Sequence, residues 1–289
     1  MPTVLLKKLV LLLHVLLFIW LPSFGQDNSL LWKVSGNGLQ GPSYLFGTIH
    51  LICKEDFRIA NRVEEAFEAS EKIVMELDMS DPKLQSKMQG LSLNPGMKNI
   101  SEDLDASEVK LINDFLRESY GVGLEQLGIL KPFVLSTMVL MKSFPCEELE
   151  GYEVSFTSKA MESQKPIIGL ETPEFQLGIF DQIPAEIQLS ELIKIIQDQS
   201  AADDFRQLTA AYLREDTEAL YDLMVAEAMM AEYREVLLDN RNKAWVSILA
   251  NEMVAQSLFV AVGAGHLGGD QGLISLLRKA GYQVDPIRD

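Results

Sequence analysis

The sequence predicts a helix-rich α/β (α+β) fold, in which a central mixed β-sheet forms from both ends of the chain around a long helical insertion. Three observations predict it. The 289 residues are 47% hydrophobic, which is enough for a full core. Short apolar segments typical of strands gather near the two ends, within 31–77 and 258–284. The middle, at about 82–164 and 173–255, has mainly the periodicity of amphipathic helices.

The first 25 residues have the pattern of a secretory signal peptide. Lys7 and Lys8 precede an apolar run over 9–21, and Ser23 and Gly25 place small residues before a predicted cleavage after Gly25. The alternative is a membrane anchor, but the run is shorter than the roughly 20 residues that a spanning helix needs. We therefore expect an exported protein, periplasmic or extracellular, with residues 26–289 forming a single domain and no stable membrane span after cleavage.

The first predicted elements after this segment are a hairpin, a helix and a strand. Apolar and aromatic runs at 31–34 and 43–46 flank a Gly- and Asn-rich turn, which favours a β-hairpin. A helical pattern at 59–69 precedes a buried strand at 72–77. Strand, helix and strand in this order predict a βαβ opening.

Helices dominate the rest of the chain, with a few short strands between them. We expect helices at 107–120, 131–144 and 153–164, the first capped by Ser107 and stopped by Gly121. After a strand at 166–170, polar residues suggest four helix starts, at Ser190, Asp203, Asp216 and Asp239. The chain closes with a strand at 258–262, a helix at 271–280 and a strand at 282–284.

Charge and cysteine content narrow the possible partners and the compartment. The formal net charge is −17 and no basic cluster lies in the body of the chain, which argues against nucleic acid as a partner. The two cysteines, Cys53 and Cys146, are compatible with one disulfide in an oxidising compartment or with two buried thiols.

Apart from His14 in the signal segment, the chain has two histidines, and both close a Gly-x-x-His tetrapeptide. Gly47 to His50 follows the strand 43–46, and Gly263 to His266 follows the strand 258–262. In open α/β sheets the ligand crevice lies outside the carboxyl ends of the strands. A lone histidine is more often structural, but this shared placement predicts one common site.

Two imidazoles need a third ligand to hold a hydrolytic metal well. Glu76 is the best candidate, because it follows the apolar residues 73–75 of a predicted strand, where an unpaired charge would be costly. The alternative is that Glu76 lies on a solvated face of that strand.

Two further residues are candidate site residues with ordinary alternatives. Glu171 follows the strand 166–170, where it could join the site or cap a helix that starts with Pro173. Arg241 lies near the predicted start of a helix, and the usual place for such an arginine is the surface. If that helix start faces the crevice, the helix dipole and Arg241 together would favour an anionic group or a polarised carbonyl.

Several segments together resemble the TraB/GumN family. They occur in the family's order over nearly the whole chain and are Leu31-Trp32-Lys33-Val34, Tyr44-Leu45-Phe46-Gly47-Thr48-Ile49-His50, Val74-Met75-Glu76-Leu77-Asp78, Gly169-Leu170-Glu171-Thr172 with Gln176, Arg241-Asn242 and Gly263-Ala264-Gly265-His266. One segment departs from the family pattern, since Gly151-Tyr152-Glu153 stands where many relatives have Gly-x-Asp.

The family is similar to the Tiki metalloproteases and to the erythromycin-esterase and ChaN-like group. The resemblance implies a divalent metal, with manganese or cobalt favoured over zinc and with iron also possible, held by His50, Glu76 and His266. It implies a hydrolase acting on a peptide or protein substrate. In the mechanism that we expect, the catalytic residues are Glu76 as ligand or general base, and Glu171 and Arg241, which support the ligands or contact the oxyanion. Because ChaN-like members bind haem, the alternative is a non-enzymatic protein that binds haem or sequesters a peptide.

Overall fold

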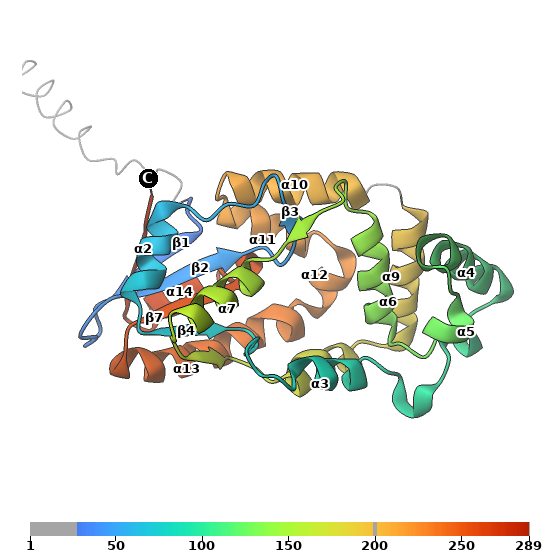
Figure 1. Cartoon of the computed structure of the whole chain (residues 1–289), viewed down its shortest axis with the longest axis horizontal. Coiled ribbons are helices and arrows are strands. Elements are labelled where there is room, and N and C mark those ends of the chain that lie inside the picture. Colours follow the sequence, from blue (N-terminus) through green and yellow to red (C-terminus); the bar gives the residue numbers. More distant parts are fainter. Residues whose placement is uncertain (1–27, 199–200, 289) are drawn as a thin grey trace, which may run out of the picture.

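The computed structural model describes residues 28–198 and 201–288, and its centre is a six-stranded sheet (Figure 1). The strand order is β6-β4-β7-β2-β1-β8. The strands are β1 (Leu31–Ser35), β2 (Ser43–Thr48), β4 (Lys72–Met75), β6 (Ile167–Gly169), β7 (Leu258–Gly263) and β8 (Gln283–Pro286). Strands from both ends of the chain thus share one sheet, as predicted. The predicted signal peptide, residues 1–25, lies outside the described residues.

The sheet is mixed, and four neighbouring strands in it run parallel. β1 is antiparallel to β2 and to β8, which confirms the predicted hairpin. β7 pairs in parallel with β2 on one side and β4 on the other, and β4 pairs in parallel with β6. The residues that follow β2, β4, β6 and β7 therefore emerge at the same edge of the sheet.

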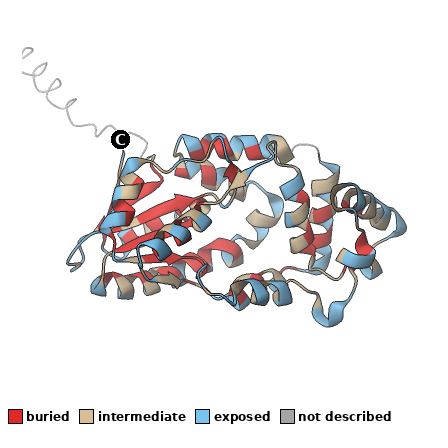
Figure 2. Cartoon of the chain, viewed as in Figure 1, coloured by how far each residue is buried: buried red, intermediate tan, exposed pale blue. Residues whose placement is uncertain are grey.

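Strict alternation along the strands divides the core into two layers. In β4, Ile73 and Met75 join one hydrophobic cluster, whereas Val74 joins the other; in β7, Phe259 and Val260 divide in the same way. Such alternation is expected of a sheet that is covered on both faces. Figure 2 shows the buried strands between their covering helices.

Helices of different parts of the chain cover the two faces. Residues of α2 (Asn61–Ala69), α7 (Tyr152–Glu162), α10 (Ala201–Leu213) and α11 (Thr217–Val225) belong to the first cluster. Residues of α13 (Asn240–Ala255) and α14 (Leu273–Lys279) belong to the second. The second face, with α13, is the one that completes the site described below.

One part of the predicted helical insertion forms a lobe with a core of its own, at the end of the molecule away from the sheet (Figure 1). It contains α4 (Ala106–Tyr120), α5 (Leu124–Leu127), α6 (Pro132–Lys142) and α9 (Ala185–Gln197). Between lobe and sheet, α3 (Leu84–Leu91) packs on α8 (Pro173–Gly178). The remaining short elements are β3 (Ile52–Cys53), η1 (Pro95–Met97), η2 (Ile100–Asp103), β5 (Leu149–Glu150), η3 (Phe180–Gln182), α12 (Ala228–Arg234), η4 (Glu235–Asp239) and η5 (Ala264–His266).

Two predicted helix starts are wrong. Asp105, rather than Ser107, caps α4, because its carboxylate accepts from the backbone N–H of Glu108 while the Glu108 carboxylate accepts from that of Asp105. α9 begins at Ala185 after Pro184, which leaves Ser190 inside the helix. In both cases a stronger start signal lay a few residues upstream.

Other predicted boundaries agree with the structure. Gly121 ends α4 with a φ of 75°, and Asp216 caps α11 by accepting from Ala219 N–H. Asp203 lies in the first turn of α10. A third predicted helix start, Asp239, is wrong, because Asp239 has helical dihedral angles, caps nothing and continues the π-helical turn η4 into α13.

A disulfide joins Cys53 to Cys146, which decides between the two predicted states of the cysteines. Next to it, β3 and β5 form a two-stranded ladder, and Lys54 pairs with Glu148 at 2.6 Å between Nζ and Oε2. The bridge thus holds the segment after His50 against the segment that leads into α7. No helix among residues 28–198 and 201–288 is long and apolar enough to cross a membrane.

Replacing Cys53 and Cys146 together by Ser should lower the free energy of unfolding by about 2–5 kcal/mol, since the bridge closes a long loop in the unfolded chain. Urea unfolding of the variant beside the oxidised wild type measures this difference. Reduced wild-type protein is the control and should match the variant. A difference below about 1 kcal/mol would contradict a stabilising role for the bridge.

Candidate active site

The four parallel strands each deliver one predicted site residue to the same edge of the sheet. His50 follows β2, Glu76 follows β4, Glu171 follows β6 and His266 follows β7. Gly263, the last residue of β7, lies among three of them: a Cβ atom built on it would be 3.3 Å from Glu76 Oε1, 3.7 Å from His50 Nε2 and 3.7 Å from His266 Cδ2. A Cβ here would press on Glu76 Oε1 and make ordinary contacts with the two histidine rings, so the close approach of the carboxylate to the backbone favours glycine.

Glu76 is a buried carboxylate, 8% exposed, so the alternative of a solvated strand face is wrong. Its Oε1 accepts from the Gly263 N–H at 3.0 Å, and its Oε2 accepts from Gln176 Nε2 at 3.0 Å and from Arg241 Nη2 at 2.8 Å. Burial would raise the pKa of Glu76, but the protonated ring of His50, the Arg241 guanidinium and the hydrogen bond from Gly263 N–H hold that pKa well below its ordinary value. The group is therefore ionised at neutral pH.

Arg241 is also buried, at 9% exposure, and links two carboxylates. Its Nε and Nη2 donate to the two oxygens of Glu171 at 2.8 and 2.9 Å, in addition to the Nη2 contact with Glu76. Nη1 donates to the Leu237 carbonyl at 3.0 Å, and the guanidinium lies 4.9 Å from the ring centre of Trp245. The surface alternative for Arg241 is wrong.

The prediction that a helix N-terminus adds positive charge beside Arg241 is also wrong. α12 is kinked at Tyr233, but from Arg234 onward the turn η4 runs directly into α13, so the N–H groups at the start of α13 do not begin a helix. A π-helical turn directly precedes Arg241 instead, and such turns occur frequently at functional sites. The positive charge at this place comes from the guanidinium.

Glu171 does not cap the following helix, because the Thr172 side chain does so by accepting from Phe175 N–H at 3.2 Å. The Glu171 side chain is 3% exposed, and besides Arg241 it accepts from Trp245 Nε1 at 3.0 Å. Both of its oxygens are engaged within the protein. Glu171 can therefore hold Arg241 in place but has no free oxygen for a substrate.

His266 is buried and held in one ring orientation. Its Nδ1 lies 2.6 Å from Asn242 Oδ1, and the Asn242 amide in turn donates to the Gln271 carbonyl at 2.9 Å. Burial lowers the pKa of His266 to about 3, so the ring is neutral at neutral pH. With the proton on Nδ1, the lone pair of Nε2 faces Arg241 Nη1 at 3.2 Å and Glu76 Oε1 at 3.9 Å.

His50 lies on the open side of the site, with 68% of its side chain exposed. Its Nδ1 donates to Glu153 Oε1 at 2.9 Å, and the Thr48 hydroxyl donates to the same oxygen at 2.6 Å. The hydrogen bond with Glu153 raises the pKa of His50 to about 9, and solvent screens part of this effect. The other ring nitrogen, Nε2, faces Gly263.

Glu153 is the functional residue that sequence reasoning left open. The Gly151-Tyr152-Glu153 departure from the family pattern marked the position, but a side chain at the start of a helix gives no sign of what it contacts. The β3–β5 ladder and the disulfide bring the start of α7 to His50. The acid at this place therefore does touch the site.

The donor chemistry of the site suits a divalent ion, but its arrangement is not that of a formed metal centre. Each histidine has its Nδ1 engaged by a protein oxygen, which is typical of metal-binding imidazoles, and Glu76 adds a carboxylate. Among the described residues, however, no group of three or more His, Cys, Asp or Glu side chains is placed to hold a metal. The Arg241 guanidinium contacts both Glu76 and His266.

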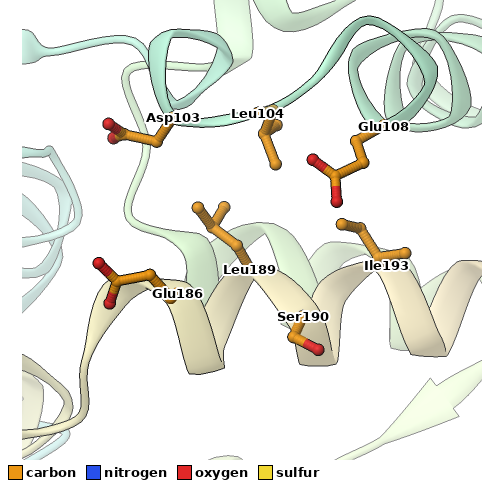
Figure 3. A pocket seen from close by; sticks show the side chains of 7 residues that line it. All are labelled: Asp103, Leu104, Glu108, Glu186, Leu189, Ser190 and Ile193. Carbon is orange, nitrogen blue, oxygen red and sulfur yellow. The ribbon is translucent and has the colours of Figure 1, made fainter.

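A shallow groove of about 230 Å³ lies elsewhere, in the helical lobe (Figure 3). It is lined by Asp103, Leu104, Glu108, Glu186, Leu189, Ser190 and Ile193. None of the predicted site residues is among them. Its acids have local roles, since Asp103 pairs with Lys98 and Glu108 belongs to the cap of α4.

Replacing Glu153 by Gln should lower the pKa of His50 toward its ordinary value of 6.5, since the charge that stabilises the imidazolium is removed. An NMR titration of the imidazole protons of the metal-free protein measures the change. Glu148→Gln, which alters an exposed acid near the same disulfide, is the matched control and should leave the pKa of His50 where it was. An unchanged pKa in Glu153→Gln would contradict the assigned pairing.

The stability of the metal-free protein should fall as the pH is lowered from 6.5 to about 3. In this range the unfolded chain protonates His266 while the folded protein, with the pKa of His266 lowered to about 3, does not. His266→Gln should flatten this dependence, by an amount of the order of a few kcal/mol. Urea unfolding at a series of pH values tests the prediction, and equal slopes for variant and wild type would refute it.

Curated relatives of this chain are named as metalloproteases. It is 24% identical to metalloprotease TIKI2 of Danio rerio, over 89% of this chain and 61% of the relative. It is 23% identical to metalloprotease TIKI1 of Danio rerio, over 89% and 63%, and 23% identical to metalloprotease TIKI2 of Xenopus tropicalis, over 92% and 61%. The chain thus spans less than two thirds of the length of these relatives. No solved structure matches it.

The family match covers the whole region that carries the sheet and the site. The model of the TraB/PrgY/gumN family matches residues 30–286, from the residue before β1 to the last residue of β8. The matched region includes both Gly-x-x-His tetrapeptides and the acids and arginine that converge with them. The chain therefore belongs to the TraB/PrgY/gumN family.

Proposed function

We propose that this protein is a metal-dependent hydrolase that cleaves a peptide bond in a peptide or protein substrate. One observation carries the proposal: the Nε2 side of His50, the ring of His266 and the carboxylate of Glu76 meet around Gly263, at the carboxyl edge of a parallel sheet. The metalloprotease names of the relatives support the same reaction class.

In this proposal His50, Glu76 and His266 hold the ion, which is manganese, cobalt, iron or zinc. A divalent ion held there supplies Lewis acidity and makes water a nucleophile near neutral pH. The neutral state of His266 suits this role, because an imidazole binds metal through an unprotonated nitrogen. Asn242 and Glu153 fix the ring orientations from behind.

The remaining groups divide into those that face the reaction and those that hold others in place. Arg241 supplies positive charge for the oxygen that becomes negative when a carbonyl is attacked. Glu171 and Trp245 position the guanidinium from its far side, so we assign Glu171 a positioning role. Gln176, hydrogen-bonded to Glu76 Oε2, fixes the carboxylate. The exposed ring of His50 marks the side from which a substrate enters.

We further propose that the protein is exported. The Cys53–Cys146 disulfide supports this location, because disulfides persist in oxidising compartments and are rare in reducing ones. The predicted signal peptide at 1–25 is consistent with it.

The proposed function predicts metal in the wild-type protein and none in site variants. Protein purified without chelators or a histidine tag should contain about one equivalent of a divalent metal by mass spectrometry, as expected for one site. His50→Ala and His266→Ala should each lower metal occupancy and abolish cleavage of a peptide library supplied with that metal. Glu148→Gln, a surface change, should retain both properties.

Absence of metal after reconstitution with each of the four ions would overturn the proposal. The alternative, a non-enzymatic binder of haem or peptide, then predicts stoichiometric binding without turnover. A Soret band on titration with haem would identify the haem binder.

A further inference from the structure

The guanidinium of Arg241 contacts two of the three proposed metal ligands, Glu76 and His266. Its Nη2 lies 2.8 Å from Glu76 Oε2, and its Nη1 lies 3.2 Å from His266 Nε2. The first contact neutralises the charge that a cation would use. The second occupies the lone pair that an ion would need.

A second set of partners holds Arg241 from the opposite side. Glu171 accepts from Nε and Nη2 at 2.8 and 2.9 Å, the Leu237 carbonyl accepts from Nη1 at 3.0 Å, and Trp245 lies along the guanidinium. None of these partners is a proposed metal ligand. The guanidinium therefore has a full set of contacts that does not depend on Glu76 or His266.

An arginine and a divalent ion cannot share these two ligands without a cost. Like charges separated by a few ångströms repel strongly in a buried site, and guanidinium does not deprotonate in proteins. An ion that uses the lone pair of His266 Nε2 displaces Nη1 from it and competes with Nη2 for the charge of Glu76, whereas the contacts of Arg241 with Glu171 and Leu237 can remain.

We propose that Arg241 is a built-in competitor of the metal: it pairs with Glu76 and His266 in the metal-free protein and withdraws toward Glu171 when a divalent ion enters. This inference rests on the proposed metal site. It accounts for a site whose donors suit a metal but are not arranged around one. It also explains how a carboxylate as buried as Glu76 keeps a counter-charge before metal arrives.

The inference predicts opposite effects for the two ends of the Arg241–Glu171 pair. Arg241→Gln removes the competing charge and should tighten binding of Mn²⁺ to the metal-free protein by about tenfold or more, as expected for a unit charge beside a buried ion. Glu171→Gln removes the partner toward which Arg241 withdraws, so it should weaken binding of Mn²⁺. Isothermal titration calorimetry with MnCl2 measures both dissociation constants.

Arg234→Gln is the matched control, because Arg234 lies one and a half to two turns earlier in the same helical run and pairs with Asp239 outside the site. Its dissociation constant should equal that of the wild type. Thermal unfolding gives a second readout. Without metal, Arg241→Gln should melt below the wild type, since Glu76 loses its counter-charge, and Mn²⁺ should raise its melting temperature by more than it raises that of the wild type.

The outcomes separate this inference from the proposed function. If the wild type binds Mn²⁺ and Arg241→Gln binds it equally or more weakly, the competition is refuted and the metal site stands. If neither protein binds Mn²⁺, both are refuted. If Arg241→Gln does not fold, Glu171→Gln decides: weaker binding supports the competition, and unchanged or tighter binding refutes it.

Discussion

The buried carboxylate of Glu76 is the constraint on which the rest of the site depends. An ionised group at this depth is stable only when nearby donors and positive charge compensate for the water it has lost. The backbone N–H of Gly263, the amide of Gln176 and the guanidinium of Arg241 provide that compensation from three different elements. Arg241 in turn requires Glu171, so one charge at the end of β4 organises the ends of β6 and β7 and the start of α13.

The parallel pairing of β2, β7, β4 and β6 explains why these residues meet at all. Parallel strands end at the same edge, and the backbone pairing of β4 with β6 continues past the strands, since Glu171 N–H donates to the Glu76 carbonyl at 2.9 Å. The side chains beyond the strand ends are thereby brought close to one another. The two core layers make this edge rigid, because the four parallel strands β2, β4, β6 and β7 each pack residues into both layers. Catalytic geometry benefits from such support, since small displacements of reacting groups are costly.

The two halves of the site differ in burial, and the difference suits different tasks. His266, Glu76 and Arg241 are buried and hydrogen-bonded to several partners, which fixes their positions and protonation. His50 lies in the open, where only Glu153 and the nearby disulfide-linked ladder restrain it. In the proposed hydrolase, a substrate approaches the exposed ring of His50, and the buried charged cluster lies behind it.

Local patterns in the sequence were enough to predict the sheet, the helical insertion and the group of residues at the strand ends, because apolar periodicity and the Gly-x-x-His tetrapeptides are local. The helix starts at Ser107 and Ser190 were wrong because Asp105 forms a capping box with Glu108 and because Pro184 precedes the first turn of α9. Only the tertiary structure decided that Glu153 holds His50, that Glu171 faces Arg241 instead of capping a helix, and that Cys53 joins Cys146. These contacts join residues that lie 70 to 103 positions apart in the sequence. Which residues meet depends on how whole helices and strands pack together, and no local sequence pattern encodes that packing.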